Sequence, residues 1–484
     1  MSMSQRNYID FKLYLTRAAD GHGACQVSLL PTPEVGETIL PITVPIEESP
    51  NANFLQLLAA KECTFGCLVA LGKMLANCLL PEGTIRQRFL AAYDRAGTEG
   101  GVRLRLIIAD HALKMWPWEY VYFDFLGGID SKSMLGFLAL NPRISLVRHE
   151  PLPLPHPARE KTSEDITEIR MAFASAQPIN QPELQLGNDL AIIQGALKDF
   201  EVEGVHFTLD PVFTDATPDD LAYKLPKGTH IFHFAGHGIP ETDKAVAGPH
   251  REGALLLVTN KTTREEAELH ASDLAAILQN TGVRLAVLGA CSSGERQERA
   301  PWDSIAGALM AREVPAIVAM QYEVIDASAE AFTRAFYSGL ASGLSLDEAM
   351  SMGRRAMLRE TSTDPDLAEI VDVEWGVPVL YSRLPDGQLF PERMQRASGA
   401  AEQFRKVISQ QVTDIMNGQL TGVKVSLIKS GVSVEQVIGA IGKGGAATAI
   451  KATTIAPDAN IKTTQTAKKV GAGGEMTGVE VDVL

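Results

Sequence analysis

The chain has 484 residues, of which 45% are hydrophobic and 21% charged, and its formal net charge is −15. These proportions are typical of a globular protein with roughly two to four domains. The acidic balance argues against a nucleic-acid partner, because phosphate contacts need basic patches. We find neither an apolar run of about 18 residues nor the pattern of a secretory signal. We therefore expect a cytoplasmic protein that binds neither nucleic acid nor membrane.

The five cysteines are Cys25, Cys63, Cys67, Cys78 and Cys291. An odd and sparse set argues against a disulfide framework. Cys63, Cys67 and Cys78 share an apolar, helical segment that contains no histidine. We interpret these three as buried small residues rather than metal ligands. The sequence thus predicts no metal site and no cofactor.

The first part of the chain mixes strands and helices. Residues 1 to about 50 contain short apolar runs between turns, which predicts β-strands. Residues 53–95 change to helical spacing, interrupted at Pro81-Glu82-Gly83. GVRLRLIIAD predicts a further strand, and the aromatic segment MWPWEYVYF after it is interpreted as a core anchor rather than a binding face. PLPLPHP predicts an extended linker.

Apolar strands alternate with amphipathic helices from residue 165 to residue 384, which indicates a doubly wound α/β domain. Ser272 and Ser345 are the expected N-caps of two of these helices. The polar residues 239–252 predict a loop long enough to act as a lid or substrate rim. After residue 385 we expect an amphipathic helix. The Gly/Ala/Thr-rich stretch from residue 419 onward has no aromatic residue and predicts a flexible tail or a small accessory module.

Two strands of this domain end in a reactive side chain followed by glycine. HIFHFAGHG carries His237, and LAVLGACSSG carries Cys291. Ligands of open parallel sheets bind just beyond the carboxyl ends of the strands, so the two side chains can converge there. A cysteine beside an imidazole is the arrangement of a nucleophile and its base. We interpret Cys291 as nucleophile and His237 as general base, with the backbone N–H groups of Gly238 and Cys291 as oxyanion donors.

His233 is the alternative base. It lies mid-strand between two phenylalanines, where a buried and hydrogen-bonded histidine is the ordinary expectation, so we favour His237. A metal site from both histidines lacks a third ligand at suitable spacing. Cys291 alone would be interpreted as an inert buried thiol, but a histidine at a second strand end weakens that alternative. Caspase sequences also place the histidine about 50 residues before the cysteine, as here.

Several ordered motifs resemble the CHAT domain family of caspase- and separase-related peptidases: LRLRL, PWEYVYF, HFAGHG, LGACSSG, VPAIVAMQYEVID and WGVPVLY. The resemblance covers roughly residues 100–384. It implies a caspase-like, doubly wound, mostly parallel sheet with flanking helices over residues 158–384. Residues 1–157 would form a β/α lead-in that could be a pseudo-caspase half, and residues 385–484 a C-terminal extension. Family members typically have Cys-His-Gly or a similar motif where this chain has AGHG, a departure that leaves the dyad intact.

The resemblance implies a cysteine endopeptidase that cleaves protein substrates in bacterial defence or regulated cell death. We find no 34-residue repeat of the tetratricopeptide type, so the activating sensor is expected to be a partner protein or the 385–484 segment. Gln321 and Asp326 match the family's pattern and, with Asp273, are candidates for the substrate pocket, as is Asp303. An acidic lining would favour a basic side chain before the cut.

Two alternatives stay open. The protein could be a catalytically silent scaffold that uses the same cleft for binding. The extension could instead be the functional element, an assembly or targeting module that the peptidase processes.

Overall fold

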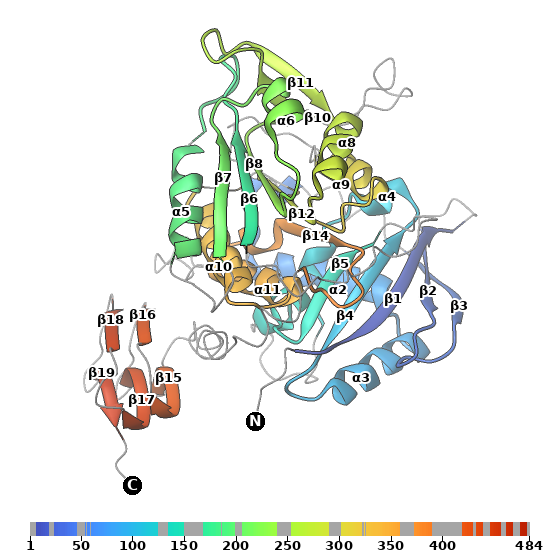
Figure 1. Cartoon of the computed structure of the whole chain (residues 1–484). Coiled ribbons are helices and arrows are strands. Elements are labelled where there is room, and N and C mark those ends of the chain that lie inside the picture. The colour runs from blue at the N-terminus through green and yellow to red at the C-terminus, as the bar shows by residue number, and fades with distance from the viewer. Residues whose placement is uncertain are drawn as a thin grey trace. The chain divides into compact units, whose positions relative to one another are not determined.

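Figure 1 shows the computed structural model of the chain. It separates into two compact units: Ser4–Glu392, and Arg393–Leu484 with Met1–Met3. The structure describes residues 6–18, 24–45, 54, 56–58, 60–123, 134–149, 168–184, 186–198, 206–239, 253–289, 302–321, 324, 326–358 and 372–389, and five strands between residues 419 and 481.

The larger unit is built on one eleven-stranded sheet of order β3-β2-β1-β4-β5-β14-β13-β12-β8-β6-β7. The regions expected at 1–157 and 158–384 both contribute strands to this sheet. A second, three-stranded sheet of order β11-β10-β9 follows the end of β8. The bounds are β1 Tyr8–Arg17, β2 Ala24–Leu30, β3 Ile39–Pro45, β4 Gly101–Ile108, β5 Ile144–Arg148, β6 Glu168–Ser175, β7 His206–Phe213, β8 Ile231–Ala235, β9 Gly238–Ile239, β10 Ala254–Val258, β11 Glu266–His270, β12 Leu285–Gly289, β13 Ala316–Met320 and β14 Pro378–Ser382.

The large sheet contains two parallel segments, one in each half, that run in opposite directions. β1, β4, β5 and β14 are parallel to one another, as are β13, β12, β8, β6 and β7. β2 and β3 are added antiparallel beside β1 at one edge. The halves meet where β13 and β14 pair antiparallel. This arrangement confirms the predicted α/β class with a mostly parallel sheet.

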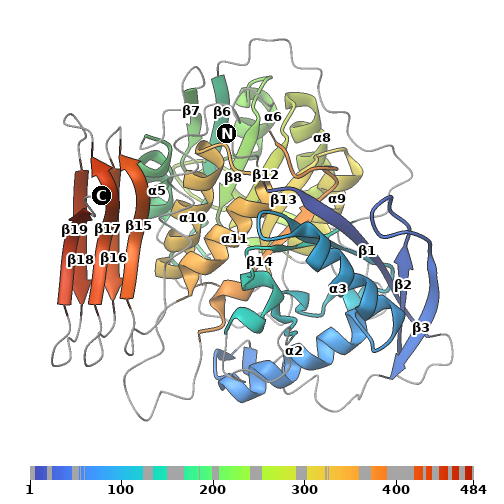
Figure 2. The same cartoon turned by 90° about the horizontal axis from the view of Figure 1, so that it is seen from below.

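Helices cover both faces of the second half (Figures 1 and 2). Phe232 and Phe234 of β8 join the core under α6, α8 and α9, whereas His233 contacts Tyr337 of α10. Alternate side chains of a strand point to opposite faces, so β8 is buried on both. The helices are α2 Phe65–Leu79, α3 Thr84–Ala96, α4 His111–Lys114, α5 Leu186–Lys198, α6 Pro218–Lys224, α8 Ala271–Thr281, α9 Trp302–Ala311, α10 Asp326–Ala341 and α11 Leu346–Met357, with 3-10 turns η1 Trp118–Tyr120, η2 Met134–Gly136, η3 Leu138–Leu140 and η4 Glu374–Gly376.

Among the helices in the described ranges, no single one is long and apolar enough to cross a membrane. Only α2 and α3 taken together, as a pair bent by 101°, meet that test, and on length and composition alone.

Local sequence signals place most of these elements. Ser345 caps α11 in a capping box with Glu348, as predicted. Ser272 is not the N-cap of α8, because pairing with Ala254 extends β11 to His270 and the helix starts at the next residue. The aromatic segment lies in the core: Trp118 is fully buried, and η1 forms around it.

The C-terminal unit, for which the sequence predicts a flexible tail or a small accessory module, is built of parallel strands. It contains five strands: β15 Gln419–Ile428, β16 Val432–Ile438, β17 Ala446–Ile455, β18 Ile461–Ala467 and β19 Glu475–Val481. They form a parallel sheet of order β15-β17-β19 and a second parallel pair, β16-β18. The helix expected after residue 385 lies outside the described residues, as do the 151–157 linker and most of the 239–252 loop.

A buried cluster of charges lies within the first half of the sheet. Arg103 forms two hydrogen bonds with Asp347, Nε–Oδ1 at 2.9 Å and Nη2–Oδ2 at 2.6 Å, and a third with Asp10 at 3.0 Å. Ser145 also donates to Asp347. Burial opposes ionisation of Asp347, but the charge and hydrogen bonds of Arg103 and the Ser145 hydroxyl hold its pKa below the ordinary value.

The same cluster holds the chain that follows β14. Arg105 donates from Nε to Asp10 at 2.8 Å and from Nη2 to the carbonyl of Leu384 at 2.6 Å. Arg103 adds a bond to the carbonyl of Pro385 at 3.1 Å. β4 is thereby tied to the strand that joins the two halves of the sheet.

Asp347→Ala is expected to lower the free energy of unfolding of the larger unit by about 3–5 kcal/mol, because it leaves the buried Arg103 guanidinium without its main partner. Tryptophan fluorescence during denaturant unfolding would measure this, since all four tryptophans lie between residues 116 and 375. The control is Asp219→Ala, an exposed aspartate in the first turn of α6, with an expected cost of about 1 kcal/mol or less. Equal losses in the two variants would contradict the prediction.

Candidate functional site

The two strands that carry the predicted dyad are neighbours in the sheet. β8 and β12 are parallel, and their register pairs Phe234 with Leu288 and Ala235 with Gly289. The N–H of Gly236 donates to the carbonyl of Gly289 at 3.3 Å, so the strand ends stay together. Cys291 itself lies outside the described residues.

His237 is held in place at the turn from β8 into β9. The residue is only 7% exposed, and its Nε2 lies 3.1 Å from the carbonyl oxygen of Pro182. Its own carbonyl accepts a hydrogen bond from the N–H of Leu256 at 2.9 Å. Because a carbonyl can only accept, Nε2 must carry the proton. In the neutral ring the lone pair is therefore on Nδ1.

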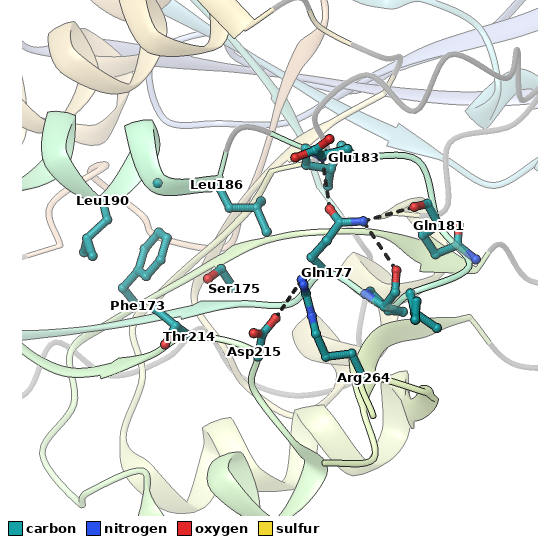
Figure 3. Close-up of a pocket in the computed structure, with 14 residues that line it drawn as sticks. Phe173, Ser175, Gln177, Gln181, Glu183, Leu186, Leu190, Thr214, Asp215 and Arg264 are labelled. Atoms are coloured by element: carbon teal, nitrogen blue, oxygen red, sulfur yellow. Dashed lines mark hydrogen bonds and ion pairs between the residues drawn. The ribbon is translucent and has the colours of Figure 1, made fainter. Parts of the chain in front are cut away.

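The loop that supplies this carbonyl is organised by Gln177 (Figure 3). Its Nε2 donates to the carbonyls of Pro182 at 2.8 Å and Gln181 at 3.2 Å, and its Oε1 accepts from the N–H of Leu184 at 3.0 Å. The role of this loop was not predicted from the sequence. Its signal was present in QPINQPEL, where two prolines follow the carboxyl end of β6 and restrict the backbone.

His233 is a core residue, as predicted. It is 3% exposed, its Nδ1 lies 2.8 Å from the Tyr337 hydroxyl, and its ring stacks on Phe173. Burial lowers the pKa of His233 to about 3, so the ring is neutral at physiological pH. This environment favours His237 as the histidine of the candidate site.

Gln321 lies directly after β13, at the same edge of the sheet as His237, but its amide is used inside the protein. Its Nε2 donates to Glu119 at 2.8 Å and to the carbonyl of Gly376 at 2.9 Å, and its Oε1 accepts from Arg148 at 3.2 Å. Glu119 is fully buried and pairs with Arg148 at 2.8 Å. Gln321 therefore anchors the end of β13 to β5 and η1.

The other predicted residues are more scattered. Asp273 is exposed in the first turn of α8. Gly238 is half-buried as the first residue of β9, where it pairs with Leu255. Asp326 begins α10, but its side chain lies outside the described part of the structure, as does that of Asp303.

A pocket of about 630 Å³ borders the loop that holds His237. Its walls come from the carboxyl ends of β6 and β7 and from the start of α5 (Figure 3). Asp215 and Arg264 form an ion pair of 3.2 Å in this wall, and Glu183 contributes an exposed carboxylate. Asp215 and Arg264 both have left-handed backbone angles, φ 48° and 54°. Such angles are uncommon outside glycine and occur often at functional sites.

The sequence model of the CHAT domain matches residues 69–406. This chain belongs to the CHAT domain family. No curated protein sequence matches it.

Among solved structures, the CHAT chain is similar to the Arg-specific cysteine proteinase gingipain R, with 14% identity and a TM-score of 0.36 over 72% of this chain and 80% of that one. It is also similar to the separase–securin complex of Saccharomyces cerevisiae, with 12% identity and a TM-score of 0.38 over 78% of this chain and 30% of that one. A third similarity is to the complex of the Porphyromonas gingivalis RgpB pro- and mature domains, with 16% identity and a TM-score of 0.35 over 63% and 70%.

The other cysteines of this CHAT protein are poor nucleophiles. Cys25, Cys63 and Cys78 are buried and Cys67 is half-buried. The interpretation as buried small residues is thus confirmed for Cys63 and Cys78, whereas Cys67 is only partly buried. Burial raises the pKa of Cys63 to about 12 and also raises that of Cys67. In the described ranges, no group of three His, Cys, Asp or Glu residues could hold a metal ion.

The buried, neutral His233 predicts a pH-dependent stability. In the unfolded chain, the His233 ring takes up a proton below a pH of about 6.5. In the folded protein, the same ring is protonated only near pH 3. The free energy of unfolding should therefore fall by up to about 1.4 kcal/mol per pH unit as the pH drops between these values. His233→Gln should flatten this slope, and His206→Gln, at an exposed position on β7, should leave it unchanged. An identical slope in wild type and His233→Gln would overturn the prediction.

Proposed function

We propose that this CHAT protein is a cysteine endopeptidase in which Cys291 is the nucleophile and His237 the general base. The observation that carries the proposal is the register of β8 and β12. Ala235 and Gly289 are paired, and His237 and Cys291 each follow two residues later along parallel strands. The bond from Gly236 to Gly289 continues the pairing toward both residues.

The orientation of His237 defines the role of each ring nitrogen. With Nε2 donating to Pro182, Nδ1 is the atom that accepts the thiol proton. The thiolate attacks the peptide carbonyl, and the N–H groups of Gly238 and Cys291 stabilise the oxyanion. His237 then returns the proton to the leaving amine, and water hydrolyses the thioester with the same nitrogen as base.

The proposal includes a setting and a partner. The CHAT family membership supports a role in bacterial defence or regulated cell death, carried out in the cytoplasm. We propose that a protein partner activates the enzyme. A scaffold that only binds at the same strand ends is the second candidate, because the aligned strands alone would serve it equally well.

Cys291→Ala and His237→Ala are each expected to reduce peptide cleavage by at least about 10³-fold, since each removes one half of the proton-transfer pair. Cleavage of a peptide library, with and without candidate partner proteins, would measure this. The controls are Cys67→Ala, which removes a half-buried thiol, and His230→Gln, which precedes the amino end of β8; both should keep activity. Cleavage that survives in Cys291→Ala, or partner binding without cleavage by any form of the protein, would favour the scaffold.

The pocket bordered by the 177–184 loop supports a preference for a basic substrate residue. Arg264 neutralises Asp215, which leaves Glu183 as the charge without a described ion-pair partner among the lining residues that the structure describes. A carboxylate at the mouth of a partly apolar pocket attracts a Lys or Arg side chain whose methylene stem packs on the wall.

Glu183→Gln is expected to lower kcat/KM for peptides with a basic residue near the cut by about tenfold, which corresponds to 1.4 kcal/mol, and to leave neutral peptides little changed. Asp273→Asn is the matched variant, because the sequence alone assigns that aspartate to the pocket. A loss of basic preference in Asp273→Asn and not in Glu183→Gln would move the specificity site to the start of α8.

A further inference from the structure

The C-terminal unit is a stack of parallel strands with a repeating register. Along the sheet β15-β17-β19, Thr421 is paired with Thr448, and Thr448 with Thr477. β16 and β18 are paired in the same parallel manner, and consecutive strands of the two sheets contact each other. Figure 2 shows the strands side by side. The chain therefore winds through successive, similar rungs, as in solenoid proteins.

The first and last rungs of the three-stranded sheet have nearly the same sequence. β15 contains TGVKV (residues 421–425) and β19 contains TGVEV (residues 477–481). The middle rung, β17, has TAIKA at the paired positions. The outer rungs differ within this segment only by Lys424 in place of Glu480.

The charges at this register position are arranged asymmetrically. Lys424 is paired with Lys451, and Lys451 with Glu480. One end of the stack thus presents a lysine position and the other a glutamate position. Opposite charges at directly paired positions favour strand association, and like charges oppose it.

Both ends of the stack are strand edges. β15 and β19 are the terminal strands of their sheet, and among the described strands none pairs with their outer sides. The unpaired N–H and C=O groups of an edge strand are a template for another strand. The edge strands β15 and β19 have matching sequences. β15 of one copy therefore suits the edge that β19 of another copy forms.

We propose that the C-terminal unit binds a second copy of this chain, with β15 of one copy added in parallel to β19 of the next. In the register used inside the protein, this contact pairs Thr421 with Thr477, Val423 with Val479 and Lys424 with Glu480. The contact joins two different edges, so it does not close on itself. Each added copy leaves a free β15 and a free β19, and the assembly grows into an open filament.

Charge reversal tests the proposal in the full-length protein. Lys424→Glu gives each copy two acidic edges and blocks the contact between copies. The same change gives the paired positions 424 and 451 opposite charges, so the strand pairing within one chain is not weakened. Glu480→Lys gives two basic edges and blocks the contact in the same way.

Sedimentation of wild type is expected to show a weight-average mass that rises at least about twofold as concentration increases from ~5 to ~100 µM, by mass action. Each single variant should remain a monomer. Mixing the two variants should restore the rise of the weight-average mass with concentration. The carboxylate introduced at position 424 of one variant then meets the ammonium group introduced at position 480 of the other, and the wild-type pair forms at the second edge.

A monomeric wild type at ~100 µM, or Lys424→Glu assembling as the wild type does, would overturn the proposal. A mixture that stays monomeric would show that the Lys424–Glu480 register is wrong. Far-UV circular dichroism of each variant serves as the folding control. Peptide cleavage is not used as a readout, so failure of this test is separate from failure of the proposed enzyme activity.

Discussion

The join between the two halves of the sheet depends on buried charges. β14 and β5 share a single registered pair, Tyr381 with Arg148, so backbone pairing alone connects them weakly. Arg103 and Arg105 supply the missing connection by binding Asp347, Asp10 and the carbonyls that follow β14. Because these guanidinium groups are removed from water, their partners must be present together for the fold to be stable. This cluster therefore contributes to the position of the strands from β13 to β7 relative to the first half.

A second cluster of buried polar side chains connects the first half of the sheet to the candidate site. Glu119, Arg148 and Gln321 link η1 and β5 to the residue immediately after β13. β13 is the neighbour of β12, and β12 is the neighbour of β8, which leads to His237. The N-terminal half is thus a physical support for the edge at which the proposed chemistry takes place.

Much of this was accessible from the sequence, because apolar periodicity and glycine-rich strand ends are local signals. They located β8, β12 and His237, and they identified His233 as a core residue. The orienting carbonyl of Pro182 was not accessible, since a backbone atom carries no side-chain signature. Gln321 was assigned to the cleft, but its amide binds Glu119, a contact between distant segments that no local pattern reveals. In the C-terminal unit the similarity of TGVKV and TGVEV was visible, yet the absence of aromatic residues and the abundance of glycine obscured it.

The bond from His237 to Pro182 has a consequence for how the site can respond to its surroundings. In many hydrolases the equivalent group is a carboxylate, whose protonation in acid removes the constraint on the ring. An amide carbonyl has no such transition in the range where proteins stay folded, so acidity does not release this imidazole. Its alignment is instead governed by the conformation of residues 177–184. A binding event that moves this loop would turn the imidazole ring without any change in its charge. The site would then respond to a change in the conformation of the loop rather than to a change in pH.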